Sequence, residues 1–225
     1  MFVVLEGLDG AGKSTQVKML REYLEGLCPG LEYIHFPRYD APVYGDLISK
    51  FLRGGFGNID EVHPQLVALL FAEDRRDAAP YIRKVLEGGG SVLLDRYVYS
   101  NVAYQCAKLA SDVEAAELMD WILRTEYGDF ALPRPDLNIF LNVPMSFIES
   151  SLRNGREGSD RDYLRGAADI HESDIRFQKR VRDLYLKLAE KDPALKVVDC
   201  SDENGNMLPP EAIFSRIKTV CDENR

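Results

Sequence analysis

The sequence is poor in cysteine, tryptophan and histidine. Its 225 residues include four cysteines, one tryptophan and three histidines. The cysteines form no Cys-x-x-Cys pair and no cluster with histidine at zinc-binding spacing, so we expect free thiols rather than disulfides or a structural zinc site. A chain of this length can fold around its own hydrophobic core without such staples.

Long apolar stretches and an excess of positive charge are also missing. The longest strongly apolar run, 66–72, is far shorter than the ~20 residues that cross a membrane. The apolar N-terminus, 1–5, is too short for a signal peptide. Acidic residues outnumber basic ones by 37 to 28, which gives a net charge of −9. Because nucleic acids and membrane surfaces attract basic faces, we expect a cytoplasmic protein that binds neither.

Short apolar runs rich in strand-forming residues alternate with longer segments of helical periodicity. Each gap is long enough for a crossover helix, so the pattern predicts an α/β fold with a parallel sheet covered by helices on both faces. No repeat or linker divides the chain, and we expect one domain over 1–225. The expected strands are Phe2 to Glu6, Tyr33 to Phe36, Ser91 to Asp95, Leu137 to Val143 and Lys196 to Cys200.

The segment after the first expected strand, Gly7 to Ser14, matches the phosphate-binding pattern G-x-x-x-x-G-K-S/T and opens a helix. Gly7 and Gly12 permit torsions that turn backbone N–H groups inward, and the helix N-terminus adds partial positive charge. Lys13 would reach the β- and γ-phosphates, and the Ser14 hydroxyl would bind Mg²⁺. We interpret the segment as a nucleoside triphosphate site; the alternative is a glycine turn without a ligand.

Charged residues follow two of the expected strands. Asp95 ends the third strand, where an acid beside the phosphate loop can reach Mg²⁺ through a water. Arg96 comes next, and Arg38 follows the second strand. Two arginines at the carboxyl ends of neighbouring strands, facing Lys13, indicate an acceptor that itself carries phosphate. The pattern predicts a nucleoside monophosphate kinase, and the lack of an N-K-x-D motif weighs against a GTPase.

Taken in order, these motifs resemble those of the thymidylate kinases. The resemblance implies a P-loop NTPase-type sheet of five parallel strands with an arginine-rich lid, ATP as donor with Mg²⁺, dTMP as acceptor and a homodimer. It runs from Val3 to about Ile217 and is carried by 7–15, 36–39, 71–75, Asp95-Arg96-Tyr97 with Ser100, Asn101 and Tyr104, 135–137, and the arginine-rich segment from Arg153.

The family pattern also assigns residues to each substrate. Those implied to bind ATP are Gly7, Leu8, Asp9, Gly10, Ala11, Gly12, Lys13, Ser14 and Thr15. Those implied to bind dTMP are Asp9, Phe36, Pro37, Arg38, Phe71, Arg75, Arg96, Asn101 and Tyr104.

Within the dTMP set, the resemblance implies that Phe71 stacks on the thymine and that Arg75 and Asn101 read its edge. Tyr104 would lie against C2′ of the sugar, and Asp9 would hold the 3′-hydroxyl. Arg38 and Arg96 would clamp the phosphate. By composition alone, Phe71 and Tyr104 also suit core packing, and Arg75 suits a solvated helix face.

The lid is the least defined part of the resemblance. Some family members carry an arginine within the phosphate loop, but this chain has none between Gly7 and Gly12. The cation for the transition state would then come from the lid, about 153–166, where Arg156 and Arg161 are the candidates beside Arg153 and Arg165. The stretch 153–182 holds eight basic and six acidic residues, which also suits a solvated helix face.

We therefore expect transfer of the γ-phosphoryl group of ATP to dTMP, giving dTDP and ADP and supporting dTTP synthesis. The catalytic set would be Lys13, Arg96, Asp9, Arg156 and Arg161, with Ser14 and Asp95 at the metal. Another deoxynucleotide or deoxynucleoside kinase is one alternative, and an NTP-dependent switch or binding protein is the other. The three histidines are expected in structural or surface roles.

Overall fold

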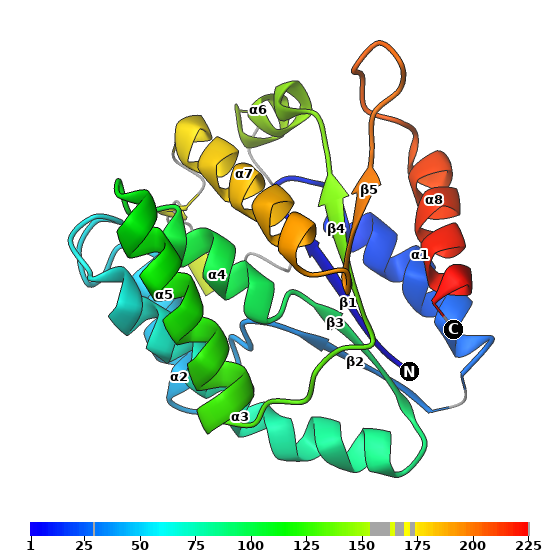
Figure 1. Cartoon of the computed structure of the whole chain (residues 1–225), viewed down its shortest axis with the longest axis horizontal. Helices are drawn as coiled ribbons and strands as arrows, with labels where there is room; N and C mark the ends of the chain where they lie inside the picture. The colour runs from blue at the N-terminus through cyan, green and yellow to red at the C-terminus, as the bar shows by residue number, and fades with distance from the viewer. Residues whose placement is uncertain (29, 154–162, 165–168, 172–173, 225) are drawn as a thin grey trace.

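The structure is a computed structural model that describes residues 1–28, 30–153, 163–164, 169–171 and 174–224 (Figure 1). Its centre is a five-stranded sheet in the order β2-β3-β1-β4-β5, and every neighbouring pair is parallel. The predicted parallel sheet is therefore confirmed. The strands are β1 (Phe2–Gly7), β2 (Leu31–His35), β3 (Ser91–Asp95), β4 (Leu137–Asn142) and β5 (Leu195–Asp199).

Helices cover both faces of the sheet. Figure 1 shows α1 and α8 on one side and α3, α4, α5 and α7 on the other. The helices are α1 (Lys13–Glu25), α2 (Tyr44–Leu52), α3 (Pro64–Glu87), α4 (Val98–Cys106), α5 (Asp112–Arg124), the π-helical turn η1 (Thr125–Asp129), α6 (Met145–Arg153), α7 (Ile175–Lys191) and α8 (Pro210–Glu223).

The core lies on the central strands. Every residue of β1 and β3 is buried, because helices cover both faces of these strands. Strand β2, at the edge of the sheet, is only half-buried. A smaller apolar cluster of Ile48, Phe51, Leu52 and Val67 joins α2 to α3. The carboxyl ends of β1, β2 and β3 meet at one edge of the sheet, which is where ligands bind in such folds.

The remaining expectations about the chain concern thiols and membranes. Cys28, Cys106, Cys200 and Cys221 are free, and all but Cys28 are buried. Within the described ranges, no helix combines the length and the apolar character needed to cross a membrane.

Candidate active site

The turn between β1 and α1 has the backbone of a phosphate-binding loop. Gly12, the N-cap of α1, has φ 74°, a left-handed conformation that favours glycine. Gly7 serves a different purpose from the one expected, because its φ is not positive. A Cβ atom there would lie 3.2 Å from the Lys13 side chain, so Gly7 leaves room for that side chain to fold back over the loop.

The Lys13 side chain lies against the phosphate-binding loop. Its side chain is 9% exposed, and Nζ donates to the Leu8 carbonyl oxygen at 3.3 Å. Ser14 and Thr15 are exposed at the start of α1, whose first turn carries no acidic residue. An N-terminus of this kind has backbone N–H groups and a partial positive charge that favour an anion.

Asp95 suits a divalent cation better than a salt bridge. It is 6% exposed at the carboxyl end of β3, which pairs with β1. Its Oδ1 atom is buried and accepts no hydrogen bond from any described residue, and a buried oxygen in that position calls for a partner. Asp95 and the Ser14 hydroxyl therefore fit Mg²⁺, which takes few protein ligands and shares its shell with phosphates and water.

A cavity of about 530 Å³ lies beside the loop. It is lined by most of the residues that the family resemblance assigns to the acceptor. The lining residues are Asp9, Phe36, Pro37, Tyr39, Leu52, Phe71, Arg75, Arg96, Tyr97, Ser100, Asn101, Tyr104, Gln105, Tyr163, Asp169 and His171.

Arg96 connects the phosphate loop to this cavity. Its φ of 68° is unusual for a residue with a side chain, and such conformations concentrate at functional sites. Nη2 donates to Asp9 Oδ1 at 2.7 Å and to the Tyr104 hydroxyl at 3.2 Å, while Nη1 donates to Ser100 Oγ at 3.1 Å. Tyr104 in turn donates to Asp9 Oδ2 at 2.9 Å. Three of the expected site residues, Asp9, Arg96 and Tyr104, thus form one network.

Arg38 is the expected acceptor residue that does not line the cavity. Its Nε atom donates to Asp74 Oδ1 at 2.9 Å, and Nη2 donates to the Asp74 carbonyl oxygen and to Asp77 Oδ2. The Asp74 side chain is 1% exposed and that of Asp77 is 52% exposed. The pair with Asp77 is therefore the weaker restraint, because exposed ion pairs contribute little free energy.

Arg75 and Asn101 face the cavity from adjacent helices and share one partner. Arg75 lies on α3 and forms a two-bond ion pair with Glu126, with Nε–Oε2 and Nη2–Oε1 distances of 2.5 and 2.7 Å. Asn101 lies on α4 and donates from Nδ2 to the same carboxylate at 2.8 Å. The structure thus places Arg75 in the cavity and not on a solvated face.

The aromatic residues occupy two environments. Phe36 is 1% exposed and belongs to the main core, although it also borders the cavity. Phe71 is half-buried and meets Phe51 edge to face, with ring centroids 6.5 Å apart. Phe71 also lines the cavity, and an aromatic ring is a surface on which a base can stack.

The chain is similar to known proteins in sequence and in fold. The family description "Thymidylate kinase" matches residues 5–207. The chain is 35% identical over 208 residues to a probable thymidylate kinase of Thermococcus kodakarensis, covering 90% of this chain and 91% of that one. It is 34% identical over 189 residues to the thymidylate kinase of Mycobacterium tuberculosis, covering 84% and 86%. The solved Candida albicans thymidylate kinase superposes with a TM-score of 0.72 at 27% identity, covering 99% of this chain and 91% of that one.

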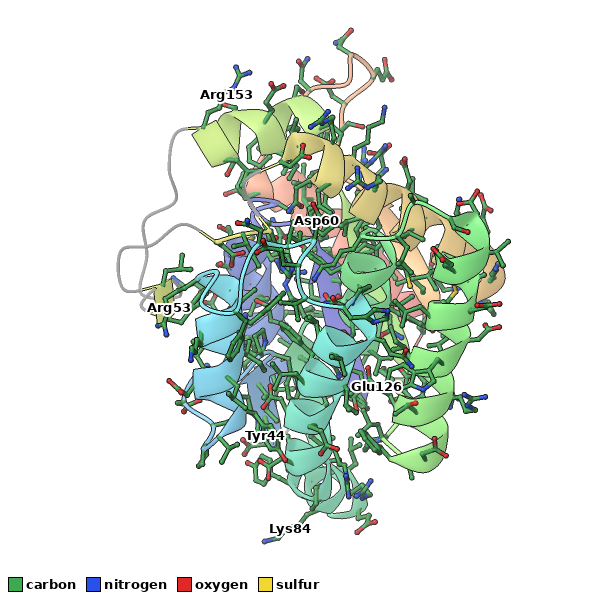
Figure 2. The ribbon with its side chains drawn as sticks, turned by 90° about the vertical axis from the view of Figure 1, so that its left-hand side faces the viewer. Tyr44, Arg53, Asp60, Lys84, Glu126 and Arg153 are labelled. Atoms are coloured by element: carbon green, nitrogen blue, oxygen red, sulfur yellow. The ribbon has the colours of Figure 1, made fainter. Side chains whose placement is uncertain are left out.

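The chain belongs to the thymidylate kinase family. The expected family resemblance and fold are thereby confirmed. Of the lid residues that the resemblance suggested, Arg153 ends α6 and pairs with Glu149 at 2.6 Å (Figure 2). Arg156, Arg161 and Arg165 lie outside the described residues.

Several residues of the candidate site were not expected from the sequence. Tyr39 stacks on Tyr163 with ring centroids 3.8 Å apart, and the Tyr163 hydroxyl donates to Asp169. Glu126 holds Arg75 and Asn101 from a distant part of the chain. His171, for which we expected a structural or surface role, is 6% exposed and lines the cavity. Burial, helped by the charges of Lys108 and Arg96, lowers the pKa of His171 well below its ordinary value.

Lys108 lies just beyond the end of α4. Its Nζ atom is buried, hydrogen-bonds to no described residue, and lies 4.8 Å from the centroid of the Phe51 ring. Burial lowers the pKa of Lys108 to about 7, against the opposing charges of Asp60 and Asp169. Near pH 7, the folded protein therefore carries Lys108 in both its charged and its neutral form.

Proposed function

We propose that this chain transfers the γ-phosphoryl group of ATP to dTMP, giving dTDP and ADP, and that it supplies dTTP synthesis. Membership of the thymidylate kinase family supports the proposal. The observation that carries it is the contact of Asp9 with Arg96, at 2.7 Å. This contact joins a phosphate-binding loop to the cavity that most of the acceptor residues line, so donor and acceptor phosphates would meet there.

The donor half of the site is the segment from Gly7 to Thr15. Its backbone N–H groups would hold the ATP phosphates, with Lys13 on the β- and γ-phosphates. Ser14 and Asp95 would hold Mg²⁺, which on binding neutralises the developing charge between the phosphates.

In the acceptor half, Phe71 would stack on thymine while Arg75 and Asn101 bind its edge. Tyr104 would lie against C2′, and Asp9 would hold the 3′-hydroxyl. Phe36 and Pro37 would form the adjoining wall.

Arg96 and Arg38 would bind the acceptor phosphate. Arg38 would do so by exchanging the exposed Asp77 for the phosphate while Asp74 keeps it in place. A phosphate is the stronger partner for arginine, because it accepts several charge-assisted hydrogen bonds.

The chemistry requires positioning rather than a strong base. The attacking atom is a phosphate oxygen whose second pKa is about 6, so it is largely ionised at neutral pH. The obstacle is repulsion between two polyanions, which Lys13, Arg96 and a lid arginine, Arg156 or Arg161, would neutralise along an in-line path. We further propose that the protein works in the cytoplasm as a homodimer, without nucleic acid or membrane partners.

Two alternatives make different predictions. A deoxynucleoside kinase needs a general base to activate a hydroxyl acceptor. Because its acceptor carries no phosphate, it needs no arginine to bind one. An NTP-dependent switch hydrolyses ATP whether or not dTMP is present. ADP release with ATP and Mg²⁺ should be measured for dTMP, dUMP, dCMP, dGMP, AMP and thymidine. We expect the highest kcat/KM with dTMP; release that is independent of the acceptor, or highest with thymidine, would contradict the proposal.

A further inference from the structure

Glu126 is a buried acid with no place in the phosphate chemistry. It is 0% exposed and lies in the π-helical turn η1, which follows α5 directly. Phe130 N donates to the Thr125 carbonyl oxygen at 2.8 Å in this turn. π-helical turns are rare and occur often at functional sites, because the extra residue in the turn redirects a side chain. Figure 2 shows Glu126 between α3 and α5.

The carboxylate of Glu126 determines how the Asn101 amide is oriented. Asn101 Nδ2 lies 2.8 Å from Glu126 Oε1 and 2.9 Å from the Ala68 carbonyl oxygen. An ionised carboxylate and a carbonyl both accept hydrogen bonds and donate none. The NH₂ group of Asn101 must therefore face them, and the amide oxygen must point the other way.

This orientation leaves a specific pattern at the cavity. Asn101 Oδ1 is buried and accepts no hydrogen bond from a described residue. Glu126 also occupies Nε and Nη2 of Arg75, and no hydrogen bond among the described residues uses Nη1. Both side chains line the cavity. The wall of the cavity therefore includes one residue with an unused acceptor, Asn101, and one with an unused cationic donor, Arg75.

The pattern complements one kind of pyrimidine. Thymine and uracil carry a ring N3–H donor beside the C4 carbonyl acceptor, whereas cytosine carries a ring N3 acceptor beside a C4 amino donor. A site built to hydrogen-bond a substrate N–H leaves its own polar groups unpaired when the analogue lacks that donor, and it can reject that analogue by roughly 10⁴- to 10⁵-fold.

We propose that Glu126 is a positioning residue that selects a thymine- or uracil-type base over cytosine by fixing Asn101 and Arg75 together. The proposal rests on the proposed function, because it takes the nucleobase to lie between Phe71, Arg75 and Asn101. Glu126 itself does not line the cavity and acts only through these two side chains.

The test is Glu126→Gln, which keeps the size of the side chain but replaces one acceptor by an NH₂ donor. That donor would face Asn101 or Arg75. The Asn101 amide would then no longer be held with its oxygen toward the base. We expect the ratio of kcat/KM for dTMP to kcat/KM for dCMP to fall by at least roughly tenfold. The fall should arise mainly from a higher KM for dTMP, with the KM for ATP unchanged.

Asp74→Asn is the matched control. Asp74 is also buried on α3 and also pairs with an arginine, Arg38, but that arginine is assigned to the phosphate and not to the base. Loss of the Asp74–Arg38 ion pair should change the rates with dTMP and dCMP by the same factor. A selectivity ratio that falls equally in Asp74→Asn and Glu126→Gln would mean that any lost buried ion pair has this effect, and would overturn the proposal.

Glu126→Asp covers the possibility that the glutamine variant does not fold. It keeps the charge but withdraws the carboxylate by one methylene group, so a smaller fall in the ratio is expected. An unchanged ratio in whichever variant folds would refute the positioning role while leaving the dTMP kinase assignment intact. If the unmodified protein transferred no phosphate to dTMP, the proposed function itself would have failed.

Discussion

Tyr104 combines two contacts that mutation can separate. Its hydroxyl bonds to Asp9 and Arg96, and its ring lies beneath the Arg96 guanidinium, 5.0 Å from the ring centroid. The side chain is 6% exposed, and burial raises the pKa of its hydroxyl well above the ordinary value. The hydroxyl is therefore a neutral donor to Asp9, and only the ring is suited to contact the sugar.

We expect Tyr104→Phe to keep the preference for the deoxyribonucleotide and Tyr104→Ala to relax it. A buried 2′-hydroxyl without a partner costs about 1–3 kcal/mol, so removing the ring should reduce the preference for dTMP over ribothymidine monophosphate by roughly tenfold or more. The measurement is kcat/KM for both nucleotides in both variants. An unchanged ratio in Tyr104→Ala would place sugar recognition elsewhere.

We expect Lys108→Met to stabilise the protein, and most strongly at low pH. The pKa of Lys108 is about 7 when folded, against 10.5 as its ordinary value. Below pH 7 the folded protein carries this buried charge at full cost, about 5 kcal/mol, and the cost disappears as the pH rises to about 10.5.

The gain in Tm of Lys108→Met should therefore be largest at pH 6 and shrink toward pH 10. Lys187→Met, at a lysine that is 61% exposed, is the control and should show no such trend. A constant gain across this range would mean that the pKa of Lys108 is the same in the folded and unfolded protein, as for a solvated lysine.

The sequence could predict candidate site residues but not all of their partners. Lys13 lies in the loop after the first predicted strand, Asp95 ends the third and Arg96 comes next, so the parallel sheet determines where each of them lies. The partners of Arg38 and Arg75 depend on tertiary contacts. Glu126 is separated from Arg75 by 51 positions, and nothing near it in the sequence distinguishes it from a surface acid.

The Glu6 carboxylate connects β1, α4 and α7 by hydrogen bonds beneath the site. It is 0% exposed on β1 and accepts hydrogen bonds from Tyr97 N and Ser100 N at the start of α4, at 3.0 and 3.3 Å. It also accepts from the Ser100 and Tyr185 hydroxyls at 2.6 and 2.8 Å, the latter on α7. This carboxylate therefore fixes α4, which carries Tyr104, against the sheet, and Ser100 on the same helix also contacts Arg96.

We expect Glu6→Gln to lower the free energy of unfolding by about 1–3 kcal/mol, because an NH₂ group replaces an oxygen that accepts hydrogen bonds and leaves buried donors unpaired. Urea denaturation would measure the change. Glu114→Gln, at an exposed acid on α5, should alter the unfolding midpoint very little. Equal midpoints for the two variants would show that the Glu6 network contributes no net stability.

Elements were easiest to predict where the strands are buried on both faces. The expected limits of β1 and β3 match the structure closely, because continuous apolar sequence marks a covered strand. Strand β2 begins at Leu31, two residues before the expected start, and ends at His35 rather than Phe36. As an edge strand it is half-buried along its length, so polar residues such as Glu32 hide its beginning. The turn η1 has no sequence signature of its own.

The arrangement of the fold leaves apolar side chains on the outer surface of α3. Leu66 and Leu69 are 64% and 36% exposed there, and Tyr81 further along the same helix is 48% exposed. Leu66 and Leu69 are three residues apart and therefore share one face of the helix. The opposite face of α3 carries Arg75 and Phe71 to the cavity, so an interface on the outer face would also brace the acceptor site.

If the protein is a homodimer that pairs through this surface, Leu66→Glu combined with Leu69→Glu should separate it into single chains of 25.4 kDa. Burying two like charges opposite their symmetry copies costs several kcal/mol, enough to shift the equilibrium strongly at micromolar concentration. Light scattering on both forms would measure the mass.

Val113→Glu, at a residue of α5 that is 67% exposed, is the control and should leave the mass unchanged. A double variant that keeps the mass of two chains would exclude this face of α3 as the interface, and an unmodified protein that runs as one chain would exclude the dimer itself.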